Sequence, residues 1–177
     1  MNPPQSPFTD EYTRDYARIN NDILRRSSWT VEDERWLLTL IDLPIPQPPM
    51  TPPTQERGTD HNVAWERVDL HRAAISAVGT RLGLGVPTPE PVVEAFEAAV
   101  LVAMAHPHEG YRSSGMAAAW DAGWIDRPDV RIAFERIRDE DPEARLRRVA
   151  ERRLRDYDGL PAIESAMADE PCAGCPR

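Results

Sequence analysis

The sequence predicts an all-α protein: a compact, irregular bundle of about five to seven helices with a proline-rich segment after the second helix. Apolar side chains recur at three- and four-residue spacing along most of the chain, which is typical of helices with one buried face. No stretch of four or more residues alternates apolar and polar side chains as a half-buried strand would. No repeat of fixed period is found, so the sequence favours a bundle over a helical solenoid.

Two helices are expected before residue 43. The first covers about residues 10–26, where Ile19 and Ile23 belong to a set of apolar side chains at near-helical spacing. The second covers about residues 31–42, with Thr30 as its N-cap and acidic side chains that suit the first turn of a helix.

A proline-rich segment, residues 43–60, follows the second helix. Proline has no backbone N–H group and favours extended conformation over helix or sheet. We therefore expect a linker, or a strap that lies over the surface of the molecule.

Several further helices are expected after residue 60. They cover about residues 62–82, 89–105 and 114–124, one helix that begins at residue 128, residues 142–157 and a short last helix over residues 161–168. The helix over residues 89–105 is apolar on nearly all sides, so we expect it at the centre of the core. Residues 106–110 are expected to form a turn, and Asp141 is the expected N-cap of the helix that follows it.

The chain is accordingly divided into four parts: a two-helix segment (1–42), the proline-rich linker or strap (43–60), the main helical bundle (61–168) and a tail with a CxxC motif (169–177).

The composition of the chain excludes several classes of function. Its 177 residues carry a formal net charge of −9 and include no lysine, so all 21 cationic side chains are arginines. Catalysis through a lysine Schiff base is therefore excluded. The longest apolar run, residues 98–105, is far shorter than the roughly 20 residues of a membrane span, and the first residues do not resemble a signal peptide. We expect a cytoplasmic protein, and the arginine-only, proline-rich coding suggests a bacterial, phage or mobile-element source.

A row of arginines on the helix over residues 142–157 is the clearest candidate site. At about 100° per residue, four of these side chains fall within an arc of roughly 80°, separate from the apolar side of the helix. The four are Arg145, Arg148, Arg152 and Arg155. They predict an anionic partner, which we expect to be an acidic protein surface, because a chain of net charge −9 disfavours nucleic acid. The alternative is a solvated face whose charge is neutralised by neighbouring acids.

Aromatic residues supply candidate apolar contacts for the same partner. Trp120 and Trp124 are four residues apart on a predicted helix, where they would belong to the core or, if exposed, form an anchor pair for a partner protein. Tyr111 is a third candidate contact.

A CxxC motif near the end of the chain is a candidate metal site. Cys172 and Cys175 supply two of the four ligands of a tetrahedral zinc ion, and His106 and His108 are the natural donors to complete it. A thiol-redox pair and two exposed thiols are the alternatives. Apart from zinc at this site, no cofactor is expected.

Sequence motifs typical of enzymes are missing. HExxH, GxxxxGK[ST], GxGxxG and GxSxG do not occur, and no predicted helix carries ExxH. No catalytic residue is therefore assigned, although a site built from residues far apart in the sequence stays open.

We expect a non-enzymatic protein-binding module that serves as an adaptor, inhibitor or assembly component. One alternative is a zinc-binding or thiol-redox protein that uses the CxxC motif. A further alternative is a nucleic-acid-associated regulator that uses the arginine-rich helix. No membrane partner is expected, and self-association into a homo-oligomer is left open.

Overall fold

A computed structural model describes residues 8–160, and within this range the chain is helical with no β-strand, as predicted. None of the described helices is long and apolar enough to cross a membrane. The expected helix over residues 161–168 and the CxxC motif lie outside the described range. In chain order the elements are α1 (Asp10–Arg18), the π-helical turn η1 (Ile19–Ile23), α2 (Val31–Ile41), α3 (Asp60–Gly83), α4 (Glu90–Met104), α5 (Glu109–Asp121), α6 (Pro128–Glu140) and α7 (Ala144–Tyr157).

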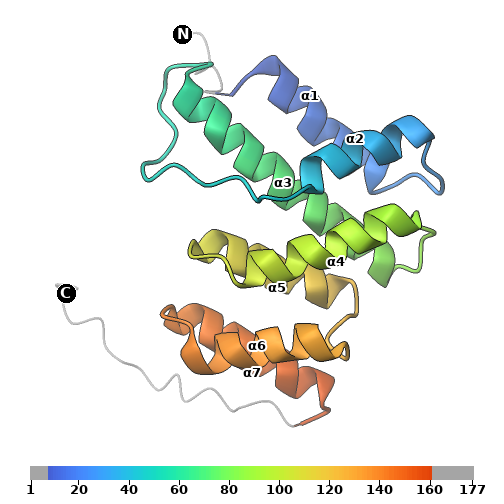
Figure 1. Cartoon of the computed structure of the whole chain (residues 1–177), viewed down its shortest axis with the longest axis vertical. Helices are drawn as coiled ribbons and strands as arrows, with labels where there is room; N and C mark the ends of the chain where they lie inside the picture. Colours follow the sequence, from blue (N-terminus) through green and yellow to red (C-terminus); the bar gives the residue numbers. More distant parts are fainter. Residues whose placement is uncertain (1–7, 161–177) are drawn as a thin grey trace, which may run out of the picture.

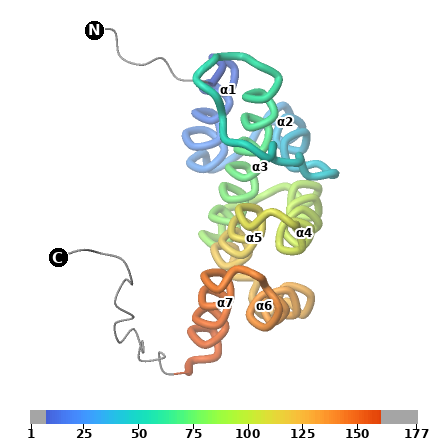
Figure 2. The backbone as a smooth tube through the Cα atoms, turned by 90° about the vertical axis from the view of Figure 1, so that its left-hand side faces the viewer, coloured from blue at the N-terminus to red at the C-terminus, as the bar shows by residue number. Residues whose placement is uncertain are grey.

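The helices stack in pairs along the long axis of the molecule (Figure 1). Below α1, α2 and α3 in this view lie the hairpin α4–α5 and then the hairpin α6–α7. In the view turned by 90°, α2, α4 and α6 form one layer, and α3, α5 and α7 form the other (Figure 2). This pairwise stacking arises without a sequence repeat, so the sequence did not predict it.

The core follows the line between the two layers. α4 contacts α2, α3, α5 and α6, which agrees with the central position expected for it. α5 packs closely on both α3 and α4 because glycines stand where the backbones meet: a Cβ atom on Gly79 would lie 2.5 Å from the carbonyl oxygen of Ala118, and one on Gly115 would lie 3.0 Å from the backbone nitrogen of Met104. The glycines therefore hold α5 in the middle of the stack.

The N-terminal helix differs from its predicted form. It changes after Arg18 from an α-helix to the π-helical turn η1, in which the backbone N–H of Leu24 donates to the carbonyl of Ile19 at 3.0 Å. Ile19 and Ile23 are fully buried in this turn. The sequence could not distinguish the two helix types, because both bring side chains four residues apart to nearly the same side.

α2 begins at the predicted N-cap. The Thr30 hydroxyl accepts from the backbone N–H of Asp33 at 3.1 Å, and the Asp33 carboxylate accepts from the backbone N–H of Thr30 at 3.1 Å. A hydrogen bond from Arg18 lowers the pKa of Asp33 to about 2. The capping box thus also ties α1 to α2.

Residues 43–59 contain no helix, and several of them bond to the first turns of α3. The side chain of buried Asn62 accepts from the backbone N–H of Thr54 at 2.9 Å and donates to its carbonyl at 3.0 Å. The indole N–H of Trp65 donates to the carbonyl of Thr51 at 2.8 Å. These bonds hold the segment against α3 although its prolines offer few backbone donors.

Two predicted helix starts are wrong. α5 begins at Glu109, five residues earlier than residue 114, because the ring of His108 accepts from the backbone N–H of Gly110 and caps the helix. α7 begins at Ala144 with Glu143 as N-cap, and Asp141 is instead the C-cap of α6. The carboxylate of Asp141 is engaged by an arginine of α5, described below.

Candidate protein-interaction site

α7 is the last described helix of the stack, and its outer side carries exposed arginines. Arg145, Arg148 and Arg152 are exposed and follow one another at three- and four-residue spacing along one side of the helix. None of their three side chains makes an ion pair or a hydrogen bond with any residue between 8 and 160. On the opposite side, facing the core, lie Leu146, Ala150 and Leu154. We call Arg145, Arg148 and Arg152 the arginine face.

The remaining arginines of α7 are engaged within the fold. Arg155, the fourth predicted member of the row, is half-buried and lies 3.7 Å from the carboxylate of Glu151. Arg153 donates to the carbonyl of Met116, and Arg147 donates to the carbonyls at the start of the helix. The structure thus keeps three of the four predicted arginines available and assigns the fourth to an internal contact.

Most arginines elsewhere in the described range are paired or hydrogen-bonded. Ion pairs include Arg18–Asp33, Arg57–Asp10, Arg127–Glu97, Arg131–Asp158 and Arg138–Asp139. Four exposed arginines whose side chains make no hydrogen bond or ion pair with residues 8–160 are scattered over α1, the η1–α2 connection, α2 and α3: Arg14, Arg25, Arg35 and Arg67. Within the described range, α7 is where three such side chains line up on one helix.

The aromatic candidates do not extend the arginine face. Tyr111 is fully buried, so in this structure it offers no surface to a partner. Trp120 and Trp124 are partly buried and pack against the core, and each indole ring has an arginine over it. α5 ends at Asp121 with Ala122 as its C-cap, so Trp124 lies beyond the helix and the two tryptophans do not share one helix as predicted.

The two candidate zinc donors use their rings to shape the α4–α5 loop. The Nδ1 atom of His106 accepts from the backbone N–H of His108 at 3.0 Å, and Nδ1 of His108 accepts from the backbone N–H of Gly110 at 3.1 Å. A histidine that binds a metal through one ring nitrogen ordinarily donates through the other, and these two accept instead. Over residues 8–160 no three histidine, cysteine or acidic side chains gather as a metal site would require. The structure therefore does not identify His106 and His108 as metal ligands, and Cys172 and Cys175 lie outside the range it describes.

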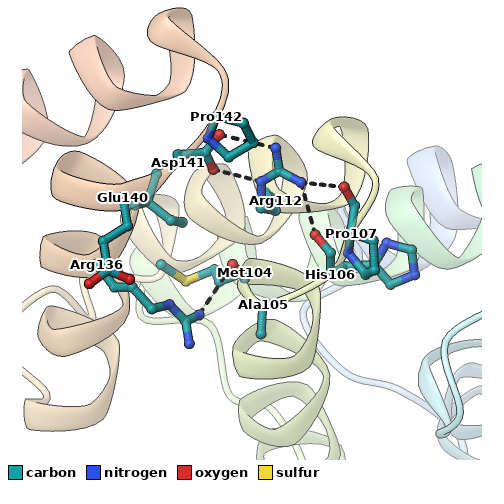
Figure 3. Close-up of a pocket in the computed structure, with 10 residues that line it drawn as sticks. Met104, Ala105, His106, Pro107, Arg112, Arg136, Glu140, Asp141 and Pro142 are labelled. Atoms are coloured by element: carbon teal, nitrogen blue, oxygen red, sulfur yellow. Dashed lines mark hydrogen bonds and ion pairs between the residues drawn. The ribbon is translucent and has the colours of Figure 1, made fainter.

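A buried ion pair adjoins this loop. Arg112 of α5 donates through Nε and Nη2 to the carboxylate of Asp141 at 2.6 and 3.0 Å, and through Nη1 to the carbonyls of His106 and Pro107 (Figure 3). An open groove of about 300 Å³ lies over this pair, with Arg136 and others on its wall. Because the donors of Arg112 are occupied, the groove is lined by a charge that is already neutralised.

Sequence reasoning missed the residues that organise the interior. Arg112, Arg81 and His71 are buried, and nothing in their local sequence separates them from the exposed arginines and histidines. Arg81 lies under the ring of Trp29 and donates to the carbonyls of Ile23 and Pro87 at 2.9 Å each. The one available signal was position: Arg81 and His71 occur among apolar residues of α3 at helical spacing.

Comparison of the chain with models of protein families, with curated proteins and with solved structures finds no match.

Proposed function

We propose that this protein is a non-enzymatic binding module that recognises an acidic partner protein through the arginine face of α7. The observation that carries the proposal is the alignment of Arg145, Arg148 and Arg152 on the outer side of α7, exposed and without an ion pair among the described residues. The chain as a whole has a net charge of −9, whereas the three aligned arginines make this side of α7 locally positive. An acidic surface is the complement of such a row.

The chemistry of arginine supports a protein carboxylate as the group recognised. A guanidinium offers two parallel N–H donors that match the two oxygens of a carboxylate, so each side chain can bind one Asp or Glu in a fixed geometry. From Arg145 to Arg152 the rise of α7 is about 10 Å, a length over which two or three carboxylates of a partner helix fit. We propose this acidic protein as the partner, in a cytoplasmic system of a bacterium, phage or mobile element.

The arrangement of the fold also supports a binding role. Helix pairs stacked along one axis have long outer surfaces while each pair still buries its apolar side against its neighbours. Stacks of this kind are commonly used for binding. One fold serves many functions, so the arginine face carries the proposal.

Charge reversal tests the proposal directly. The probes are a fluorescent decapeptide of glutamate and a duplex DNA of similar charge, each titrated with the full chain at about 150 mM salt. We expect the double variant Arg145→Glu/Arg148→Glu to bind the peptide at least roughly tenfold more weakly than the parent chain. The matched control, Arg14→Glu/Arg67→Glu, changes the net charge equally at two exposed arginines on α1 and α3 and should retain the parent affinity.

Two results would contradict the proposal. Equal loss of affinity in both double variants would mean that net charge and not the arginine face determines binding. If the chain binds the duplex more tightly than the peptide, and its affinity for the duplex falls steeply as salt rises, the partner is a nucleic acid and not an acidic protein.

A further inference from the structure

The α4–α5 loop is held by histidine rings that act as hydrogen-bond acceptors. Nδ1 of His106 accepts from the backbone N–H of His108, and Nδ1 of His108 accepts from Gly110 in the first turn of α5. A ring nitrogen accepts only while it carries no proton. Both bonds therefore require that Nδ1 of each imidazole is unprotonated.

A third histidine, His71, is buried in the interior near His106. His71 of α3 and His106 are both buried and both lie beside Tyr111, with ring centroids 5.6 and 4.6 Å from the tyrosine ring. Four polar atoms of this cluster are buried without a hydrogen-bond partner among the described residues: Nδ1 and Nε2 of His71, Nε2 of His106 and the hydroxyl of Tyr111. The surroundings of the cluster therefore favour neutral imidazole rings. No acceptor among the described residues is in place for an N–H group of His71.

The charged groups around the cluster also disfavour imidazolium. Burial lowers the pKa of His106, and His108 and Arg112 lower it further. Burial lowers the pKa of His71 to about 4, with a second contribution from His106. From α6 and its junction with α7, Arg136, Glu140 and Asp141 line the groove beside His106, but the carboxylate of Asp141 is held by Arg112.

The other elements around the cluster bring few negative charges that could stabilise a protonated histidine. From α3 itself, Asp69 and Arg72 act on Tyr111 with opposite sign, and burial raises the pKa of that hydroxyl. On the side of the proline-rich segment, residues 47–50 share the lining of an open groove with His106, and they carry no titratable side chain. No carboxylate of the described residues is hydrogen-bonded to either buried ring.

We propose that the α4–α5 loop is an acid-sensitive latch, in which protonation of His106 and His71 releases the loop and the first turn of α5 from the rest of the stack. A proton on Nδ1 of His106 turns an acceptor into a donor that faces the N–H of His108, so the bond is lost. A cation also stands close to the N-terminal end of α5, where the partial charge of the helix is positive. The groove over Arg112 and Asp141 borders His106 and Pro107, and so does a second open groove between residues 47–50 and residues 106–108, so release of the loop opens both.

Hydrogen exchange of the full chain tests the latch. We compare amide protection at pH 7.5 and pH 5.5, corrected for intrinsic rates, in the first turn of α5 (Gly110 to Arg112) and at Ala150 of α7 as reference. The expected result is an opening constant in α5 that is about tenfold larger at the lower pH and that exceeds, at both pH values, the opening constant of the reference amide, which reports global unfolding.

Three variants assign the effect to the cluster. His106→Asn keeps an acceptor near the position of Nδ1 but cannot be protonated, and His71→Leu replaces an unpartnered ring by an apolar side chain. Each should reduce the acid-induced opening of α5, whereas His61→Asn, a control at the start of α3, should leave it unchanged.

The latch is overturned if the parent chain shows equal protection of α5 at both pH values, or if the His61 variant removes the effect as fully as the other two. If a variant fails to fold, an NMR titration of the parent chain tests the latch in its place. Ring protons of His71 and His106 should shift at the same pH as the α5 amides, and titration of the rings near pH 6.5 without movement of these amides would refute the latch.

Discussion

Arg112 and Asp141 form a bidentate ion pair that is almost completely buried and joins the first turn of α5 to the junction of α6 and α7. The same guanidinium binds two carbonyls of the α4–α5 loop, so one side chain holds three segments together. In addition, the Asp141 carboxylate accepts from the backbone N–H of Glu143 at 2.8 Å, which orients the start of α7. The helix that carries the arginine face is therefore positioned by a residue of α5.

Breaking this pair from one side should destabilise the protein strongly. We expect Arg112→Met to lower the free energy of unfolding by about 3 to 5 kcal/mol, because the carboxylate of Asp141 stays buried without its partner. Urea denaturation measures the change. The double variant Arg112→Met/Asp141→Leu should recover part of the loss, and Arg138→Ala, which breaks the exposed pair with Asp139, should cost less than about 1 kcal/mol. A loss as small for Arg112→Met as for Arg138→Ala would show that the buried pair does not hold the junction.

The close approach of α3 and α5 should tolerate no Cβ atom at Gly79. Alanine there would place its Cβ atom 2.5 Å from the carbonyl oxygen of Ala118, which is backbone and cannot move alone. We expect Gly79→Ala to lower the free energy of unfolding by about 1 to 3 kcal/mol, although alanine is the better helix former by about 1 kcal/mol. Thermal unfolding followed by circular dichroism gives the comparison. Ser76→Ala, at an exposed position of the same helix, should be neutral or slightly stabilising, and a neutral Gly79→Ala would place the helices further apart than described.

The stability of the protein should fall as the pH is lowered from about 6.5 toward 4. In the unfolded chain His71 takes up its proton near pH 6.5, whereas burial lowers its pKa in the folded state to about 4. The unfolded state thus binds more protons in this window, and the contribution of neutral His71 is fully present above it and lost as the pH falls through it. The two pKa values correspond to a loss of about 3 kcal/mol, measured by urea denaturation at a series of pH values.

The variant His71→Leu should flatten this part of the pH profile. Asp33 serves as an internal reference, because its pKa is lowered to about 2 and its contribution is lost only at still more acidic pH. A parent profile that is flat between pH 6.5 and 4 would show that His71 is not held in a neutral, buried state.

Removal of the two cysteines should leave the described fold unchanged. We expect Cys172→Ser/Cys175→Ser and the parent chain to have the same free energy of unfolding, with and without a chelator, because the rings of His106 and His108 are already engaged as acceptors in the α4–α5 loop. Native mass spectrometry of the untagged chain supplies the second measurement. A mass excess of one zinc ion that the chelator removes, together with lower stability of the variant, would assign the chemistry to the CxxC motif.

The sequence predicted the helices well where local signals agree. The N-cap at Thr30 and the proline at the start of α6 place two helix starts correctly, because a cap or an N1 proline acts within one turn of the chain. Residues 89–105 are apolar on nearly all sides of the predicted helix, and this predicted the central position of α4. The starts of α5 and α7 were mistaken, because the side chains of His108 and Asp141 have roles there that depend on contacts to the neighbouring turns and to α5.

The candidate site also combines features that follow from the local sequence with features that depend on contacts in the fold. The side of α7 on which Arg145, Arg148 and Arg152 lie follows from helical geometry alone, and so does its separation from Leu146 and Leu154. Whether an arginine is available does not follow from geometry. Arg155 belongs to the same predicted row but lies beside Glu151, partly covered.

The sequence by itself determined the helical class, most of the helices and the outer side of α7, because backbone hydrogen bonds, caps and apolar spacing act over a few residues. The tertiary structure alone decided that the helices stack in pairs, that Tyr111 and His71 are interior and that Arg112 reaches Asp141, 29 residues further along the chain. Such contacts depend on how whole helices pack. Packing brings together residues that are far apart in the sequence, and their separation along the chain does not predict which of them will meet.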